Sequence, residues 1–354
     1  MAAEAESHRA AQSQLQIDDP LLQREWFAIA WSREVPYGHL LARRLMARNF
    51  VLWRSQEGLH CWLDLCAHRG ARLSLGTICK GGDGRSSDCA PLRDCLVCPY
   101  HAWEYAPTGE CVRIPSQPDL RPPAKARAQT FEVRERYGVV WVTIGTPGSL
   151  PEFAPAEDAG FRTILAGPYR FRAQGPRVIE NLLDVAHLGF VHAGLLGDPQ
   201  RGEIEDYDVV AGEDGENLHG PEAKEIRIWQ PDPDGTGAAA MVNYQYWVSG
   251  PLTAGFIKTN GAQRFAMLAQ VAPIDEETCE SRLIMSMNYG HEVPDDELLR
   301  FQDRVSEQDR VVVESQRPEL LPLDLQAELH LRSDRMAIAY RKWLHSIGFK
   351  YGTA

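Results

Sequence analysis

The residues best suited to chemistry in this sequence of 354 residues are two pairs of cysteine and histidine. Cys66-x-His68 is followed by Cys98-x-x-His101, so two thiolates and two imidazoles recur at close spacing. These ligand types suit either tetrahedral zinc or an iron–sulfur cluster, and the types alone do not choose between them. The formal net charge of −12 disfavours a nucleic-acid-binding zinc domain, because such a domain needs a basic face. The spacing therefore predicts a metal centre.

The residues around these ligands resemble the two cluster-binding loops of a Rieske [2Fe-2S] domain. The first loop is residues 66–71 (CAHRGA), and the second is residues 98–105 (CPYHAWEY). In such a domain two cysteines hold one iron and two histidines hold the other, which raises the reduction potential to roughly −150 to +300 mV. The resemblance implies that the cluster ligands are Cys66, His68, Cys98 and His101. The family usually has glycine in place of Ala102, and we expect a slight shift of the loop because alanine disfavours positive φ.

A second group of metal-binding side chains lies in the motif Asn181-x-x-Asp184-x-x-His187-x-x-x-x-His192. Histidines five residues apart lie roughly 140° apart on a straight helix, so both face one ion only if the helix breaks between them. Gly189 is where we expect that break. Two histidines leave a mononuclear site short of a ligand, and the common solution for iron adds one carboxylate and keeps open positions.

Helical phase in residues 295–313 points to one carboxylate. The predicted apolar stripe, at about 100° per residue, consists of Leu298, Phe301, Val305 and Val312. Asp309 falls about 20° from Leu298, inside this stripe. The acids on the opposite side are Asp296, Asp303, Glu307 and Glu314. A carboxylate directed into a core is costly unless it is paired or binds metal. Asp309 is therefore either a metal ligand or the partner of an inward-facing arginine.

From about residue 20 to the C-terminus, the order of these motifs is similar to that of a Rieske non-haem iron oxygenase of the type built from α subunits alone. The resemblance implies a mononuclear iron held by His187, His192 and Asp309. It also implies that Asn181 lies close to this iron and that Asp184 bridges the two metal centres. The expected fold is α+β, with an N-terminal all-β Rieske domain and a C-terminal helix-grip catalytic domain, and the expected assembly is a head-to-tail homotrimer.

Such a protein is the terminal oxygenase of a multicomponent system. A separate flavin or iron–sulfur reductase, or a ferredoxin, passes electrons from NAD(P)H to the cluster, and the iron then activates O2 beside a small substrate. Residues 333–352 are most similar to hydroxylases of saxitoxin-type guanidinium alkaloids and less closely to methylxanthine N-demethylases. We expect hydroxylation of a small, nitrogen-containing polycyclic compound, with oxidative N- or O-demethylation of a small heterocycle as the alternative.

Two rival classes make different predictions from the same sequence. A Rieske ferredoxin needs only the first domain, and the long stretch from Pro155 to Ala354 argues against it. A ligand-binding module with a similar sheet and helices would hold no iron at the second site. Three irons per chain, two in the cluster and one outside it, would exclude that module.

Composition and pattern predict a globular chain with two cores, since 44% of the residues are hydrophobic and 24% are charged. We expect a flexible tail at 1–20, the Rieske domain at 21–150 and the catalytic iron domain at 151–354. Strand-like segments in the last of these are 223–230, 240–248, 264–272 and 281–289. Helical segments are expected near 176–192, 295–316 and 333–347, with Ser333 capping the last helix and Gly348 ending it.

The cysteines and the absence of an apolar leader predict a cytoplasmic protein, where thiols stay reduced. An insertion between the two loops carries Cys79, Cys89 and Cys95, and Cys111 follows it. Four thiols are able to hold a structural zinc, but their irregular spacing favours free surface thiols. The acidic balance argues against nucleic acid or an anionic membrane surface as a partner.

Overall fold

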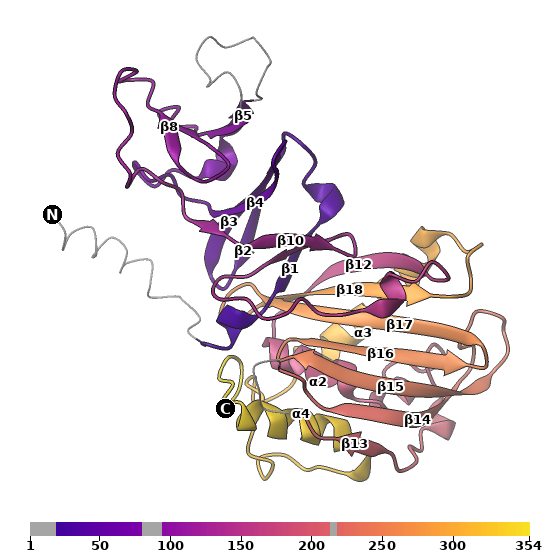
Figure 1. The fold of residues 1–354 in the computed structure, drawn as a ribbon. Helices are drawn as coiled ribbons and strands as arrows, with labels where there is room; N and C mark the ends of the chain where they lie inside the picture. The colour runs from indigo at the N-terminus through magenta and orange to yellow at the C-terminus, as the bar shows by residue number, and fades with distance from the viewer. Residues whose placement is uncertain (1–18, 80–93, 213–217) are drawn as a thin grey trace. The chain divides into compact units, whose positions relative to one another are not determined.

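The computed structural model describes residues 19–79, 94–212 and 218–354, which fall into two units (Figure 1). The first unit is residues 23–147, and the second is residues 148–354 together with residues 19–22. No helix among the described residues is long and apolar enough to cross a membrane.

The first unit is built from three small antiparallel sheets, and its described residues contain no α-helix. One sheet has the order β1-β11-β10, with bounds Phe27–Trp31, Val139–Val142 and Val133–Arg136. The next has the order β2-β3-β4-β9, with bounds Leu40–Leu45, Arg48–Ser55, Gly58–Leu63 and Thr130–Phe131. The third has the order β5-β6-β7-β8, with bounds Thr77–Cys79, Cys95–Val97, Glu104–Tyr105 and Cys111–Arg113. The predicted all-β first domain is thus confirmed.

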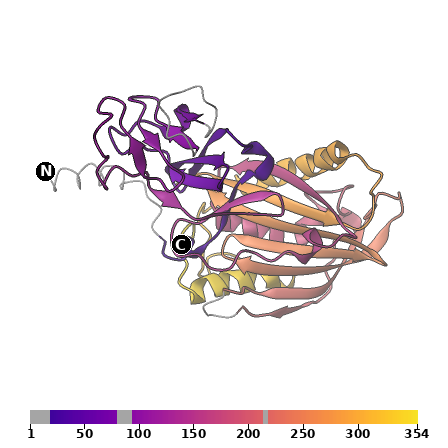
Figure 2. The same ribbon diagram turned by 45° about the horizontal axis from the view of Figure 1, so that its top comes forward.

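The second unit contains one seven-stranded antiparallel sheet with the order β12-β18-β17-β16-β15-β14-β13. In that order the bounds are Arg162–Phe171, Cys279–Met287, Gln263–Pro273, Thr253–Asn260, Ala240–Gly250, Glu222–Gln230 and Asp208–Val210. Three helices accompany the sheet, namely α2 (Gly175–Leu183), α3 (Asp295–Val313) and α4 (Arg335–Ser346). The strands lie side by side, and α2 lies behind them (Figure 1 and Figure 2). This separation of sheet and helices confirms the predicted α+β class.

The prediction of a helical stretch over residues 176–192 is wrong in its extent, because α2 ends at Leu183. Asp184 is the C-cap residue with an extended ψ of 120°, and a separate 3-10 helix, Ala186–Gly189, follows. The Asp184 Oδ1 accepts a hydrogen bond from the Ala186 N–H at 2.8 Å. Such a local turn competes with the helical backbone bonds, so a first break comes at Asp184. The 3-10 helix ends at Gly189, which is the expected break between His187 and His192.

Two long strands, β12 and β16, are absent from the pattern-based prediction. β12 contains Gly167-Pro168, which weakens a strand pattern, and the structure places it at a sheet edge where proline is tolerated. β16 reads TAGFIKTN, in which alanine, glycine, lysine and asparagine, all depleted in strands, interrupt the strand formers. A Cβ at Gly255 would come within 2.6 Å of the Trp247 ring of β15, so the close approach of that ring requires glycine.

The last helix begins two residues later than predicted, and Ser333 does not cap it. Its N-cap is Asp334, and the Ser333 hydroxyl instead donates to Asp334 Oδ1 at 3.0 Å. The C-terminal end agrees with the prediction, since Gly348 follows the helix with a φ of +72°.

The expectation of free surface thiols also fails in the described part of the insertion. Cys79 is disulfide-bonded, and Cys95 and Cys111 are buried. Cys89 lies outside the described residues. Among the residues that the structure describes, the one group of three or more close metal-binding side chains lies in the second unit, so the structural zinc has no support there.

Candidate metal centres

The two loops of the first unit have the same backbone hydrogen bonds. Cys66 N donates to Ala71 O at 2.8 Å, and Cys66 O accepts from Gly70 N at 3.0 Å. In the second loop Cys98 N donates to Trp103 O at 2.8 Å, and Cys98 O accepts from Ala102 N at 3.1 Å. Both loops reverse tightly, so each presents its cysteine inward.

Ala102 takes the place that Gly70 has in the first loop. Gly70 has a φ of +70°, and Ala102 has a φ of +54°. Left-handed backbone costs an alanine roughly 1–2 kcal/mol. The expected shift of this loop is therefore not needed to accommodate alanine, because Ala102 adopts the strained conformation and the matching hydrogen bonds remain.

The four predicted cluster ligands lie together at the end of this unit. Cys66 and Cys98 are 3% and 2% exposed within a core that includes Trp62 and Tyr105, and burial raises the pKa of the Cys98 thiol. The rings of His68 and His101 are 4.6 Å apart, and the His101 side chain is exposed. Two buried sulfur donors and two outer imidazoles fit a cluster whose histidine-bound iron faces outward.

The surrounding side chains hold this group in place. The His68 ring stacks on Trp103 at 4.5 Å with an angle of 4°, and its Nδ1 is buried without a hydrogen-bond partner. The Tyr105 hydroxyl lies 3.1 Å from Cys66 Sγ. From the sequence, Trp103 and Tyr105 are recognisable only as flanking residues of the second loop, because nothing in the sequence shows that they contact the ligands.

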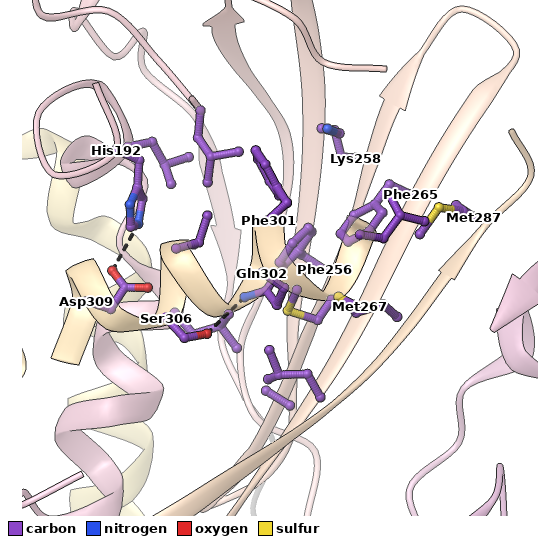
Figure 3. Close-up of a pocket in the computed structure, with 18 of the residues that line it drawn as sticks. His192, Phe256, Lys258, Phe265, Met267, Met287, Phe301, Gln302, Ser306 and Asp309 are labelled. Atoms are coloured by element: carbon purple, nitrogen blue, oxygen red, sulfur yellow. Dashed lines mark hydrogen bonds and ion pairs between the residues drawn. The ribbon is translucent and has the colours of Figure 1, made fainter. Parts of the chain in front are cut away.

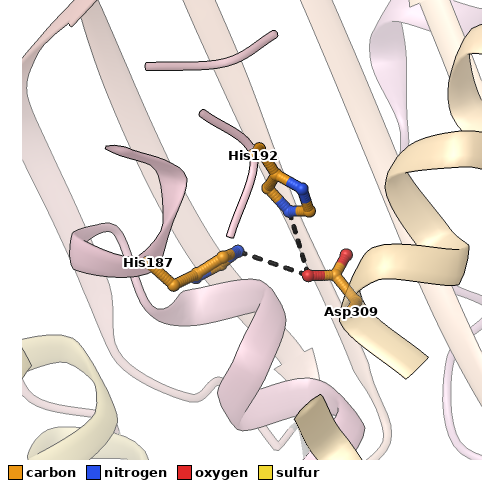
Figure 4. Close-up of side chains that lie close together, drawn as sticks. All are labelled: His187, His192 and Asp309. Carbon is orange, nitrogen blue, oxygen red and sulfur yellow. Dashed lines mark ion pairs between the residues drawn. The ribbon is translucent and has the colours of Figure 1, made fainter. Parts of the chain in front are cut away.

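In the second unit, His187, His192 and Asp309 converge (Figure 4). Asp309 Oδ1 lies 2.9 Å from His192 Nε2 and 3.5 Å from His187 Nε2. His187 comes from the 3-10 helix, His192 from the turn after it, and Asp309 from α3. One atom from each residue lies within 4.8 Å of the others, which is the spacing of ligands around one metal ion.

The hydrogen bonds around His192 prepare it for a metal. Its Nδ1–H donates to Gln308 Oε1 at 2.8 Å, which directs Nε2 toward Asp309. Asp309 Oδ1 and His187 Nδ1 are buried without hydrogen-bond partners. Burial lowers the pKa of His192, but the nearby Asp309 carboxylate and Gln308 outweigh burial and raise this pKa overall. A divalent ion would replace the proton between the two residues, so these side chains fit a 2-His-1-carboxylate site.

Helical phase correctly predicted that Asp309 faces inward, but it wrongly predicted which other side chains of α3 are buried. Phe301 and Val312 are 43% and 39% exposed, whereas the buried residues are Gln302, Val305, Ser306 and Val313. The buried stripe is thus rotated, and it accommodates polar residues because Gln302 Nε2 donates to Ser306 Oγ at 3.1 Å. No arginine of the described residues pairs with Asp309, whose ion-pair contacts are the two histidines.

Asp184 lies beside His187. Its Oδ2 is 3.4 Å from His187 Nδ1, and its side chain is 35% exposed. The two residues belong to different helices, so the turn after α2, and not a shared helix face, brings them together. Asn181 is on α2 and lines the cavity described next.

A cavity of about 470 Å³ lies between the sheet and the helices α2 and α3 and reaches the three converging side chains (Figure 3). Its walls are largely apolar, with aliphatic and aromatic side chains, and ring centroids lie 5.3–5.9 Å apart among Tyr244, Tyr246, Phe256 and Phe265. Besides the three converging side chains, the polar lining includes Asn181, Asp232, Asp234, Lys258, Ser281, Glu297, Gln302 and Ser306. An apolar cavity with a few polar groups is typical of a small-molecule site.

Comparisons with known proteins agree with this geometry. Residues 25–124 match the Rieske [2Fe-2S] domain, and residues 171–348 match the vanillate O-demethylase oxygenase C-terminal domain. The methylxanthine N1-demethylase NdmA of Pseudomonas putida is 28% identical over 92% of this chain and 89% of its own length. The probable methylxanthine N7-demethylase NdmC of Pseudomonas sp. (strain TJI-51) is 34% identical over 61% of this chain and 77% of its own length.

The solved structure of Pseudomonas putida NdmA with caffeine superposes with a TM-score of 0.75 at 26% identity. The match covers 92% of this chain and 90% of that one. The fold, the two domain matches and the high coverage of the relatives therefore all point to the same family. The chain belongs to the Rieske non-haem iron oxygenases, monooxygenase components that use a [2Fe-2S] cluster, a mononuclear iron, O2 and electrons from a reductase.

Proposed function

We propose that this oxygenase removes a methyl group from a nitrogen or oxygen atom of a small heteroaromatic compound. Hydroxylation, which the sequence led us to expect first, is the second candidate. The methylxanthine N-demethylases among the relatives favour demethylation. Both outcomes share one chemistry, since the protein positions the substrate and the metal supplies the oxidation.

The cavity that reaches His187, His192 and Asp309 is the observation that carries this proposal. We assign these three residues as the ligands of the mononuclear iron, which activates O2 when it is bound. Two imidazoles and one carboxylate are the donor set that would hold an iron able to react with O2, and the cavity reaches all three side chains. The aromatic walls exclude water and hold a flat substrate with one methyl group toward the metal. Asn181 lines the same cavity and is assigned a place close to the iron.

The overall reaction balances for a methyl group on nitrogen. One oxygen atom of O2 enters a methyl C–H bond, and two electrons and two protons reduce the other atom to water. The resulting N–CH2OH group then loses its C–N bond, which releases formaldehyde and leaves N–H. Hydroxylation of a carbon bonded only to carbon stops after the first step, so formaldehyde distinguishes the two candidates.

We assign Cys66 and Cys98 to one iron of the cluster and His68 and His101 to the other. The burial of both cysteines and the outward position of His101 support this assignment. We further propose that Asp184 couples the two metal centres in a head-to-tail homotrimer, and that a separate reductase or ferredoxin supplies the electrons. The half-exposed Asp184 carboxylate retains acceptor capacity beyond its bond to Ala186, which supports a second partner.

The function is tested by oxygen uptake with a generic reductase and NADH. The substrates are caffeine, theobromine and methoxybenzenes, and formaldehyde is measured alongside O2. We expect uptake that depends on substrate and about one formaldehyde per O2 consumed. Hydroxylated product without formaldehyde would establish the second candidate instead.

Asp309→Ala is the matched control for this assay. We expect it to keep the cluster absorbance and about two irons per chain, to lose the third iron, and to consume no O2 with substrate. Cys98→Ser, in contrast, should lose the cluster absorbance. Full iron content and activity in Asp309→Ala would contradict the assignment of this carboxylate.

A further inference from the structure

Lys258 places a buried positive charge in the wall of the cavity. It lies on β16, is 9% exposed, and is the only lysine or arginine among the described residues that line the cavity (Figure 3). Its Nζ donates to the Pro233 carbonyl oxygen at 2.6 Å and lies 5.5 Å from the centre of the Phe265 ring. In the figure it stands on the sheet side of the cavity, away from His192 and Asp309.

Asp232 and Asp234, the carboxylates that act on Lys258, accept hydrogen bonds from other residues. Asp234 accepts from the Thr236 backbone and hydroxyl at 3.2 and 2.7 Å and from Asn260 Nδ2 at 3.0 Å. Asp232 accepts from Gly237 N at 2.9 Å. No carboxylate of the described residues forms an ion pair with Lys258. The charge is therefore not neutralised by a direct partner in the wall.

A buried, unpaired ammonium is costly, and proteins rarely keep one without a use for it. Burial lowers the pKa of Lys258 to about 8, although Asp234 and Asp232 oppose this, so the side chain is still mostly charged near neutral pH. An ammonium has three N–H donors, and Pro233 takes one of them. The remaining donors are available to a molecule in the cavity.

We propose that Lys258 binds an electronegative oxygen of the substrate, either a ring carbonyl or a carboxylate, and thereby selects which methyl group faces the metal ligands. This inference rests on the proposed demethylation and defines its substrate class as flat aromatic compounds that carry such an oxygen away from the methyl group. The same charge disfavours a cationic group placed next to it, such as the guanidinium of the alkaloids suggested by residues 333–352, although Asp232, Asp234 and Glu297 also line the cavity.

A purely structural role for Lys258 is the alternative. Tyr289 also donates to the Pro233 carbonyl, at 3.3 Å, so both side chains hold the same loop. Tyr289→Phe removes one of these bonds without changing charge, and it is the matched control for Lys258→Met. Both variants should first be shown to fold, by their cluster absorbance and circular dichroism.

The test is binding to the iron-loaded protein without O2, measured by calorimetry. The probes are caffeine, 3-methoxybenzoate, 3-methoxytoluene and 3-methoxybenzylamine, which offer a carbonyl, a carboxylate, no acceptor and a cation. We expect wild-type protein to bind caffeine or 3-methoxybenzoate at least about tenfold more tightly than 3-methoxytoluene, the usual contribution of a hydrogen bond to a charged group. Lys258→Met should abolish this preference, and Tyr289→Phe should keep it.

Three results would overturn the proposal: an unchanged preference in Lys258→Met, tighter binding of 3-methoxybenzylamine to wild type, or no binding of any probe. The caffeine and 3-methoxybenzoate arms separate a carbonyl from a carboxylate. Binding is measured without turnover, so it does not depend on whether the enzyme demethylates. Failure of the proposed demethylation would instead appear in the oxygen-uptake assay, as product without formaldehyde.

Discussion

At the scale of single residues, the contact between Gln308 and His192 matters for metal binding. Gln308 accepts the Nδ1–H of His192 at 2.8 Å and so orients a ring that is only 1% exposed. Loss of such an outer partner typically weakens metal binding or activity roughly 10–100-fold. We therefore expect Gln308→Leu to lose iron to a chelator at concentrations that leave wild type loaded.

The readout is iron per chain after dialysis, with the cluster absorbance as an internal standard. Gln302→Leu is the matched control, because Gln302 is the other glutamine of α3 but bonds Ser306 instead of a histidine. Equal iron retention in the Gln308 and Gln302 variants would show that packing alone orients His192.

Lys258 predicts a specific dependence of stability on pH. Its pKa falls from 10.5 in the unfolded chain to about 8 in the fold, which corresponds to about 3 kcal/mol. Between about pH 8 and 10.5 the unfolded chain binds more protons at Lys258 than the folded chain does, so the free energy of unfolding rises with pH in this range. Below the folded pKa the buried charge destabilises the fold by the full amount. Tyr289 faces the same region and stays neutral there, because burial raises its pKa to about 12.

Lys258→Met removes this cost. The variant should be more stable than wild type at about pH 7, by up to about 3 kcal/mol, and the difference should shrink toward about pH 9.5. Urea unfolding of both proteins at the two pH values measures it. A difference that does not change with pH would mean that the ammonium is not desolvated as the structure indicates.

At the scale of loops and helices, the second cluster loop stores strain that the first does not. Ala102 has a φ of +54° where the first loop has Gly70. Glycine relieves this strain but adds freedom to the unfolded chain, so Ala102→Gly should stabilise by about 0.5–1 kcal/mol. The temperature at which the cluster absorbance is lost should rise by a few degrees. Ala71→Gly, at a position without positive φ, should lower it instead.

At the scale of the whole molecule, electron transfer between the two centres depends on the proposed role of Asp184. Asp184→Asn keeps the shape but loses the charge and part of the acceptor capacity. We expect this variant to retain both metals and the trimer and to reduce its cluster normally, yet to form barely detectable product. Single-turnover product formation from the pre-reduced variant measures the step.

The two outcomes of that experiment have different meanings. Normal single-turnover product would exclude the coupling role of Asp184. Loss of the mononuclear iron would indicate that Asp184 only orients His187, whose Nδ1 lies 3.4 Å from it. Size-exclusion chromatography with light scattering tests the trimer separately.

The sequence by itself predicted the oxygenase class, because its motifs resemble those of one family, and it predicted two candidate donor sets, because ligand type and local spacing limit which metals bind. The two loops of Cys-x-His and Cys-x-x-His and the inward direction of Asp309 are local features that survive in the fold, although the apolar stripe expected around Asp309 does not. Strands with strong alternation, such as β14 and β15, were recognisable for the same reason.

Only the tertiary structure decided the features that depend on distant contacts. The helix break at Asp184 follows from a side-chain turn, and the rotation of α3 follows from polar residues that satisfy each other. β16 was missed because Gly255 is required by the packing of Trp247, and Lys258 was missed with it. Periodicity shows which residues are apolar. Which face is buried, which residues pair and which residues line the cavity depend on contacts between side chains that are far apart in the sequence.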